Sequence, residues 1–281
     1  MPAQRRKAAN ADSQGPAKRT TRSSSKAIAE TNNAAGSKTK RSESIPIEVG
    51  EGPISLVIDH ETVKAPIACH SYTSRLKHVS ESKPPTLIFT HGAGGTLSAP
   101  AMVNFCKGYS ISNDVLAFQG SANLKARVKG FKACSSHLFV GREELVFGGR
   151  SMGARAAVMA GSDLVASKRD QPGVSLILVS YPLQSPKSDI RDQILLDLPS
   201  SARVLFIIGD RDAMCPLELL NAARKNMAAS SKLVVVRGAD HGMHIKPPSK
   251  EMEIGERTGR IAAAWTNHEL DNHDEILKID E

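Results

Sequence analysis

Short apolar runs alternate with longer, partly polar stretches from about residue 53 onward. The runs at 176–179 and 204–208 are apolar at every position. Unbroken runs of Val, Ile and Leu of this length are typical of parallel strands that are covered on both faces. Strands are predicted over residues 53–58, 63–68, 86–90, 115–118, 144–147, 175–180, 204–208 and 233–236.

The stretches between these runs have the length and composition of helices. Helices are predicted over residues 100–109, 123–138, 152–165, 216–228 and 254–270. A chain in which strands and helices alternate with short turns forms a parallel sheet with helices on both faces. About 22 residues separate the runs that end at 180 and begin near 203, too few for a bulky lid. The predicted fold is therefore α/β, a mostly parallel, doubly wound sheet flanked by helices, without a large lid domain.

Residues 1–48 differ from the rest of the chain in composition and charge. They are rich in Ala, Ser, Thr and Lys and contain no aromatic residue. Such a segment buries too little apolar surface to offset the entropy lost on ordering. The first 45 residues hold ten Lys and Arg against three acidic residues, hence +7 of the net charge of +8. We expect a disordered basic tail over 1–48 and one folded domain over 49–281.

The remaining sequence is nearly neutral, which argues against direct nucleic-acid binding by the folded domain. No run approaches the roughly 18 apolar residues of a membrane helix, and no apolar core of a secretory signal follows the first basic residues. The basic residues between Arg5 and Arg22 have the layout of a two-part nuclear-import signal. A solvated linker and a transit peptide are the alternatives. We expect a cytoplasmic or nuclear protein whose tail could contact protein partners.

The strongest chemical signal is a serine between two glycines, Gly149-x-Ser151-x-Gly153, which follows a predicted strand and opens an Ala-rich helix. This pattern is that of a nucleophile elbow, in which a tight turn exposes the serine hydroxyl and leaves no room for side chains at the glycine positions. The free N–H groups at the start of the helix face developing negative charge. A purely structural glycine turn is the alternative.

A second glycine-rich loop, THGAGG at 90–95, directly follows another predicted strand. In an oxyanion hole of this kind, one N–H comes from such a loop and one from the residue after the nucleophile. We assign the N–H groups of Met152 and of Ala93, with Gly92 as the alternative to Ala93. A phosphate-binding loop is the competing interpretation, but the segment lacks both the GK[ST] ending and the GxGxxG spacing.

An acid and a base follow the next strands in the order that a catalytic triad on this fold requires. Asp212 is the predicted acid and Asp210 its rival; the spare carboxylate would cap the helix near 216 or pair with Arg211. His241 is the predicted base, preferred over His244 because it comes directly off its loop. Two histidines without a third ligand are weak evidence for a metal. The chemistry of a serine triad requires neither a metal nor an organic cofactor, so none is expected.

Other residues near these motifs have plainer interpretations. Arg150 and Arg155 would favour an anionic substrate if they are unpaired, and otherwise bind acids or backbone carbonyls. The four cysteines form no CxxC pair, so reduced thiols are expected. Cys215 is expected to be a small buried apolar residue rather than a nucleophile, because no base lies near it in sequence.

Four segments carry a resemblance to a known family: THGAGG at 90–95, GGRSMGAR at 148–155, SYPL at 180–183 and DAMC at 212–215. They resemble the α/β-hydrolase-like domain shared by a testis-expressed protein and subunit 3 of the animal non-specific-lethal histone-acetyltransferase complex. Related bacterial proteins are described as dienelactone-hydrolase-like. The likeness covers roughly 84–245 and implies the three-layer α/β-hydrolase fold, with Ser151, Asp212 and His241 at the triad positions. Dienelactone hydrolases proper use a cysteine nucleophile, so their substrate does not carry over.

Two functions follow as hypotheses. The first is a serine hydrolase of the esterase or thioesterase type that acts on a small acyl substrate. The second is a non-catalytic scaffold with the hydrolase fold, in a nuclear, chromatin-associated complex, as the resemblance to the chromatin subunit implies. An intact set of Ser151, Asp212 and His241 favours the first, because packing alone does not require these residue types in three separate loops.

Overall fold

The computed structural model describes residues 52–74, 85–138, 145–167, 173–185, 187–273 and 276–280. The expected basic tail over 1–48 lies outside these residues, as does the start of the strand predicted at 144. None of the described helices is long and apolar enough to cross a membrane.

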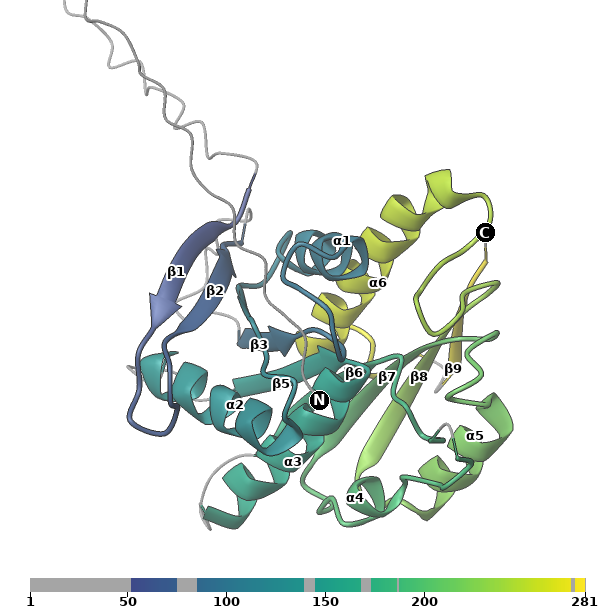
Figure 1. The fold of residues 1–281 in the computed structure, drawn as a ribbon. Coiled ribbons are helices and arrows are strands. Elements are labelled where there is room, and N and C mark those ends of the chain that lie inside the picture. The colour runs from purple at the N-terminus through teal and green to yellow at the C-terminus, as the bar shows by residue number, and fades with distance from the viewer. Residues whose placement is uncertain are drawn as a thin grey trace, which may run out of the picture. The chain divides into compact units, whose positions relative to one another are not determined.

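The described chain forms one nine-stranded sheet in the order β1-β2-β4-β3-β5-β6-β7-β8-β9 (Figure 1). β1 pairs with β2, and β2 with β4, in antiparallel register, whereas all the other neighbours are parallel. The strands are β1 (Ile54–Ile58), β2 (Ile67–Tyr72), β3 (Thr86–Thr90), β4 (Val115–Phe118), β5 (Leu145–Arg150), β6 (Ser175–Val179), β7 (Arg203–Gly209), β8 (Ser230–Val236) and β9 (Ile276–Ile279).

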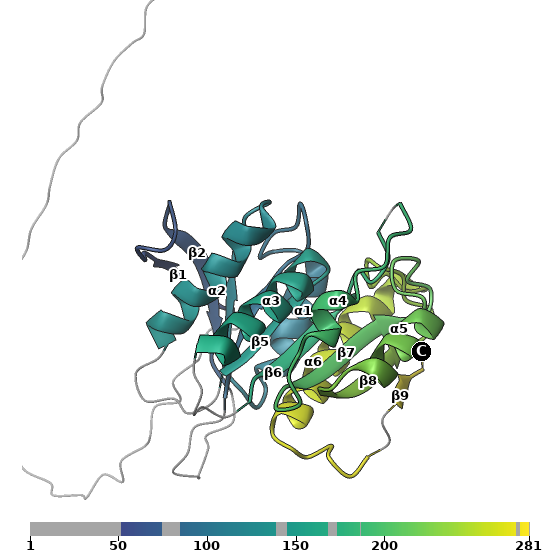
Figure 2. The ribbon, with the colours of Figure 1, turned by 90° about the horizontal axis from the view of Figure 1, so that it is seen from below.

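Helices cover both faces of the sheet and make three layers (Figure 2). The helices are α1 (Pro100–Tyr109), α2 (Leu124–Leu138), α3 (Met152–Ser167), α4 (Gln193–Leu196), α5 (Leu217–Asn226) and α6 (Glu251–Thr266), with a 3-10 turn at Pro248–Lys250. α1 and α6 pack on one face, and α2, α3, α4 and α5 on the other. Because alternate strand residues point to opposite faces, Phe147 belongs to one core cluster and Val146 to the other.

This architecture confirms the predicted fold class, including the absence of a large lid. Between β6 and β7, the described residues contain only the four-residue helix α4 and one isolated bridge, Gln184 to Ile190. The parallel strands place their carboxyl ends along one edge of the sheet, which is where ligands bind in folds of this kind.

Some elements differ from the predictions. The strand predicted at 63–68 lies at Ile67–Tyr72, because pairing of Ile58 with Ile67 and of Tyr72 with Val115 sets the register and leaves 59–66 as a turn. The last helix begins at Glu251 and ends at Thr266, earlier than predicted at both ends. β9 was not predicted, because four residues at a sheet edge carry too little pattern to be recognised.

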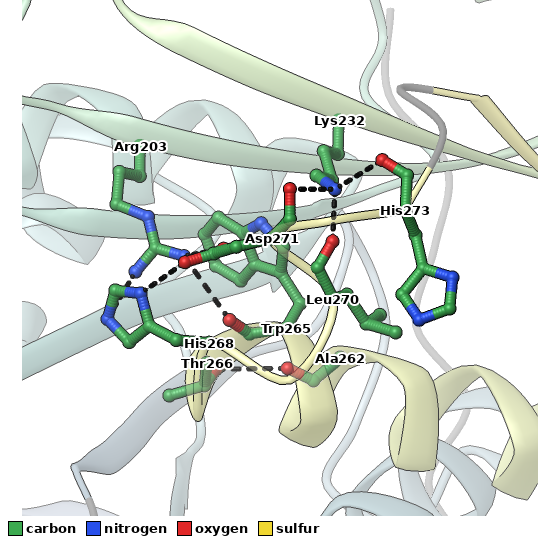
Figure 3. A network of polar contacts seen from close by, with 9 residues as sticks. All are labelled: Arg203, Lys232, Ala262, Trp265, Thr266, His268, Leu270, Asp271 and His273. Carbon is green, nitrogen blue, oxygen red and sulfur yellow. Dashed lines mark hydrogen bonds and ion pairs between the residues drawn. The ribbon is translucent and has the colours of Figure 1, made fainter.

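A polar network anchors the segment after α6 to the amino-terminal ends of β7 and β8 (Figure 3). Arg203 donates to Asp271 at 3.2 Å and to His268 Nε2 at 2.9 Å, and its guanidinium lies 4.8 Å from the Trp265 ring centre. A guanidinium only donates, so His268 Nε2 accepts and Nδ1 donates to Asp271 at 2.7 Å. Lys232 donates to the carbonyl of Leu270, which fastens the same segment to β8.

This network predicts a stability difference that depends on pH. The hydrogen bond from His268 is the main cause that holds the pKa of Asp271 below its usual value, and the charges of Arg203 and Lys232 lower it further. A lowered pKa gives stability above the unfolded-state pKa of about 3.9 that is lost as the pH falls through the folded-state pKa. Asp271→Asn should therefore lower the urea midpoint at pH 6, and the difference from wild type should shrink as the pH falls through the lowered folded-state pKa of Asp271. A difference that does not change with pH would contradict this account.

Candidate active site

Ser151 occupies a strained turn between β5 and α3. Its φ is +52°, a left-handed conformation that residues other than glycine seldom adopt. A Cβ at Gly149 would lie 2.5 Å from the backbone carbon of Gly153, and one at Gly153 would lie 2.5 Å from the carbonyl oxygen of Thr90. The turn can therefore close only with glycine at both positions, as the elbow pattern predicts.

The structure brings Ser151, His241 and Asp212 together at the carboxyl ends of β5, β8 and β7. His241 Nε2 lies 2.9 Å from Ser151 Oγ, and His241 Nδ1 lies 2.9 Å from each Asp212 carboxylate oxygen. An ionised carboxylate only accepts, so Nδ1 carries the proton and the lone pair of Nε2 faces the serine hydroxyl. The Asp212 carboxylate is fully covered, whereas 26% of the His241 side chain is exposed.

The two candidate acids have different partners. Asp212 Oδ1 also accepts the N–H of Met214 at 2.9 Å, which fixes the carboxylate in its turn. Asp210 faces away and accepts the N–H of Gly238 at 2.7 Å. The expectation that the spare carboxylate caps a helix or pairs with Arg211 is therefore wrong. Asp210 instead ties the loop after β7 to the loop after β8.

His244 lies outside this arrangement. Its side chain is 70% exposed, and its Nδ1 lies 3.3 Å from Glu251 at the start of α6. Within the described residues, no three His, Cys, Asp or Glu side chains are grouped so that they could hold a metal ion. His241 is thus the histidine that faces Ser151.

The glycine-rich loop after β3 lies against the serine. A Cβ at Gly92 would come within 3.2 Å of Ser151 Cβ and 3.8 Å of its Oγ. The N–H groups of Gly92, Ala93 and Met152 donate to no other described residue outside regular helix and strand bonding. The N–H of Met152 belongs to the first turn of α3, where helical N–H groups have no partner within the helix. Met152 therefore follows the serine in sequence with a free N–H, Gly92 lies close to the serine in space, and Ala93 is the next residue of the same loop.

Arg127 is a part of the site that the sequence analysis missed. It comes from α2, is 1% exposed, and donates to the carbonyl of His91 in the glycine-rich loop. A single arginine in a lysine-rich helix gives no sequence signal, because its burial depends on how α2 packs. His91 itself is also buried and binds backbone groups only, as expected of a structural residue.

The arginines beside the nucleophile differ in their contacts. Arg150 donates to the carbonyl of His241 and so supports the loop that carries the base. Burial lowers the pKa of Arg150, while the nearby Asp240 and Asp212 charges raise it. Arg155 is half-buried, and its Nε has no partner among the described residues. Cys215 is buried, and burial raises the pKa of its thiol to about 12, so it is largely protonated at neutral pH.

Solved structures share this architecture. Est1E from Butyrivibrio proteoclasticus is 15% identical, with a TM-score of 0.58 over 76% of this chain and 99% of that one. An alpha-beta serine hydrolase homologue from Coxiella burnetii is 19% identical, with a TM-score of 0.56 over 74% and 96%. A serine hydrolase without a lid from Xanthomonas campestris is 15% identical, with a TM-score of 0.54 over 78% and 94%. At such identities the likeness concerns the fold.

A sequence model of the alpha/beta hydrolase domain matches residues 120–267, just over half of the chain. The matched region includes the elbow at Ser151, the acid loop at Asp212 and the base loop at His241. The chain therefore belongs to the alpha/beta hydrolase domain family.

Proposed function

We propose that this protein is a serine hydrolase of the esterase or thioesterase type. The observation that carries the proposal is the continuous hydrogen-bonded line from Ser151 Oγ through the His241 ring to the buried Asp212 carboxylate. This arrangement makes a hydroxyl nucleophilic at neutral pH, because a base lies within hydrogen-bonding distance of its proton and an acid orients that base.

In the first half of the reaction, Ser151 Oγ attacks the acyl carbonyl while its proton passes to His241 Nε2. Asp212 stabilises the imidazolium that forms and keeps Nδ1 protonated. The carbonyl oxygen becomes an oxyanion, which the N–H of Met152 and that of Ala93 or Gly92 bind. Each such donor lowers the barrier by about 3 kcal/mol.

The intermediate then collapses, and the bond between the acyl carbon and the leaving group breaks. His241 donates its proton to the leaving oxygen or sulfur, which departs as an alcohol or thiol. Water attacks the acyl-serine with His241 as the base, and the carboxylic acid and free Ser151 are released. The side chains described here carry every proton in this cycle.

A small cavity beside the site supports a small acyl substrate. Its volume is about 210 Å³, and it lies between the start of α1 and the loop after His241. Phe105, Val179 and Ile254 give it apolar walls, and its charged and polar lining residues include Arg150, His244 and Glu251. A compact, largely apolar acyl group fits this lining better than a long chain, because the cavity is below the usual volume of a ligand pocket.

From the four sequence segments we also propose that this chain is related to the testis-expressed protein and to the chromatin subunit. The basic tail supports a further proposal, that protein partners bind outside the folded domain. Neither proposal changes the chemistry expected at Ser151.

The direct test is labelling with a fluorophosphonate probe, which reacts with activated serines. Wild-type protein should label, and Ser151→Ala should not, while both show the same melting temperature. A panel of short-chain 4-nitrophenyl esters and matching thioesters then identifies the preferred acyl group. Absence of labelling and of turnover in folded wild type would refute the enzyme and favour the scaffold hypothesis.

A further inference from the structure

Arg127 is a buried cation bound only by backbone carbonyls. In the part of the chain that the structure describes, no ion pair joins it to a carboxylate. Burial lowers its pKa to about 10, so it remains charged at neutral pH. An unpaired buried charge is costly unless strong hydrogen bonds compensate for the lost water.

The guanidinium binds two separate loops. Its Nη1 donates to the carbonyls of His91 and, at 3.3 Å, of Gly92, both in the glycine-rich loop after β3. Its Nε donates to the carbonyl of Ser121 at 2.9 Å and its Nη2 to the carbonyl of Gly120 at 3.3 Å, both in the loop after β4. The planar fork of an arginine can hold both loops at once, which the single ammonium of a lysine cannot do in the same geometry.

His91 connects the same two loops a second time. The N–H of Gly120 donates to His91 Nε2 at 3.0 Å, so Nδ1 carries the proton and donates to the Gly92 carbonyl at 2.7 Å. Burial is the main cause that lowers the pKa of His91, and the Arg127 charge lowers it further. The neutral ring with this tautomer therefore acts together with Arg127 on the Gly92 carbonyl.

These bonds determine where the N–H groups of the loop point. A trans peptide unit directs its C=O and its N–H in opposite directions, and the only cis bond among the described residues is Lys246–Pro247. The His91 carbonyl shares its peptide unit with the Gly92 N–H, and the Gly92 carbonyl shares its unit with the Ala93 N–H. Both carbonyls are held by Arg127, so both N–H groups point away from it, and neither has an acceptor among the described residues.

We propose that Arg127 is a positioning residue for the oxyanion hole, holding the His91 and Gly92 carbonyls so that the Gly92 and Ala93 N–H groups stay directed at the substrate oxyanion. The proposal rests on the proposed hydrolase function. Arg127 touches no substrate in this role; it prevents the two peptide units from rotating. Preorganised donors stabilise an oxyanion most, because they need not reorient when charge develops.

The test compares Arg127→Met and Arg127→Lys with wild type on a short-chain 4-nitrophenyl ester. Arg127→Met should lower kcat about 10-fold to 100-fold with little change in KM, since misdirected donors affect the transition state more than substrate binding. The kcat of Arg127→Lys should lie between those of Arg127→Met and wild type, because lysine keeps the positive charge and some of the hydrogen bonds to the loops. Lys129→Met is the matched control on α2, since that exposed side chain lies outside the site, and it should retain wild-type kcat.

A second readout separates positioning from general loosening of the fold. An ester and its thionoester develop charge on oxygen and on sulfur respectively, and sulfur is the weaker hydrogen-bond acceptor. The wild-type preference for the ester should shrink in both Arg127 variants, even if Arg127→Met also lowers the melting temperature. Wild-type kcat and an unchanged ester preference in both variants, with wild-type protein still labelled by the fluorophosphonate, would overturn this proposal alone. Unlabelled, inactive wild type would overturn the proposed function and this proposal together.

Discussion

Replacing His241 with alanine is expected to slow ester hydrolysis by about four to six orders of magnitude. His241 is the only described base within hydrogen-bonding distance of Ser151 Oγ, at 2.9 Å. Without it, the serine hydroxyl keeps its proton at neutral pH and the leaving group receives none. Because the triad members act as a unit, this loss should be about as large as that of Ser151→Ala. Steady-state kcat with the best ester of the panel measures the effect.

His244→Ala is the matched control for this prediction. His244 lies three residues further on and lines the small cavity, but its ring is exposed and lies near Glu251 rather than Ser151, so its loss should affect KM more than kcat. We expect kcat to fall by less than about tenfold, in line with an exposed side chain that makes one weak ion pair. A large loss in His244→Ala with near-normal turnover in His241→Ala would show that the base is assigned to the wrong residue.

Asp212→Asn should lower kcat by about 10⁴-fold, the second largest effect. The aspartate accepts the Nδ1 proton of His241 through both oxygens. An asparagine amide can donate a hydrogen bond to His241 Nδ1, which stabilises the tautomer that carries its proton on Nε2. In that tautomer Nε2 has no lone pair to accept the serine proton. The pH dependence of kcat/KM and the melting temperature should be recorded with the rate, so that lost orientation is distinguished from unfolding.

Asp210→Asn serves as the control for the acid. Its Oδ1 accepts the Gly238 N–H, and an amide oxygen can still accept that bond. The variant should keep most of its kcat, with at most a modest loss of stability of about 1 kcal/mol. If Asp210→Asn lost activity and Asp212→Asn did not, the acid of the triad would have to be reassigned.

The pattern of the sequence was sufficient for the fold class. Continuous apolar runs such as 204–208 require cover on both faces, and their alternation with helices leaves few topologies other than a parallel, doubly wound sheet. The elbow was also predictable, since a strand, a serine between two glycines and a helix follow one another locally. These features can be recognised in the sequence because each depends on neighbours only a few residues away.

The tertiary structure decided what depends on distant partners. Asp210 and Asp212 lie on the same turn, and the sequence favours Asp212 as the acid without deciding the contacts of either. The packing of the loops after β7 and β8 turns Asp210 toward Gly238 and Asp212 toward His241. The register of β2 depends on pairing with Val115, about forty residues away. The role of Arg127 likewise arises where α2 presses a guanidinium against two loops. Hydrogen-bond direction and burial depend on residues that are distant in sequence and close in the folded protein, so a local sequence pattern cannot predict them.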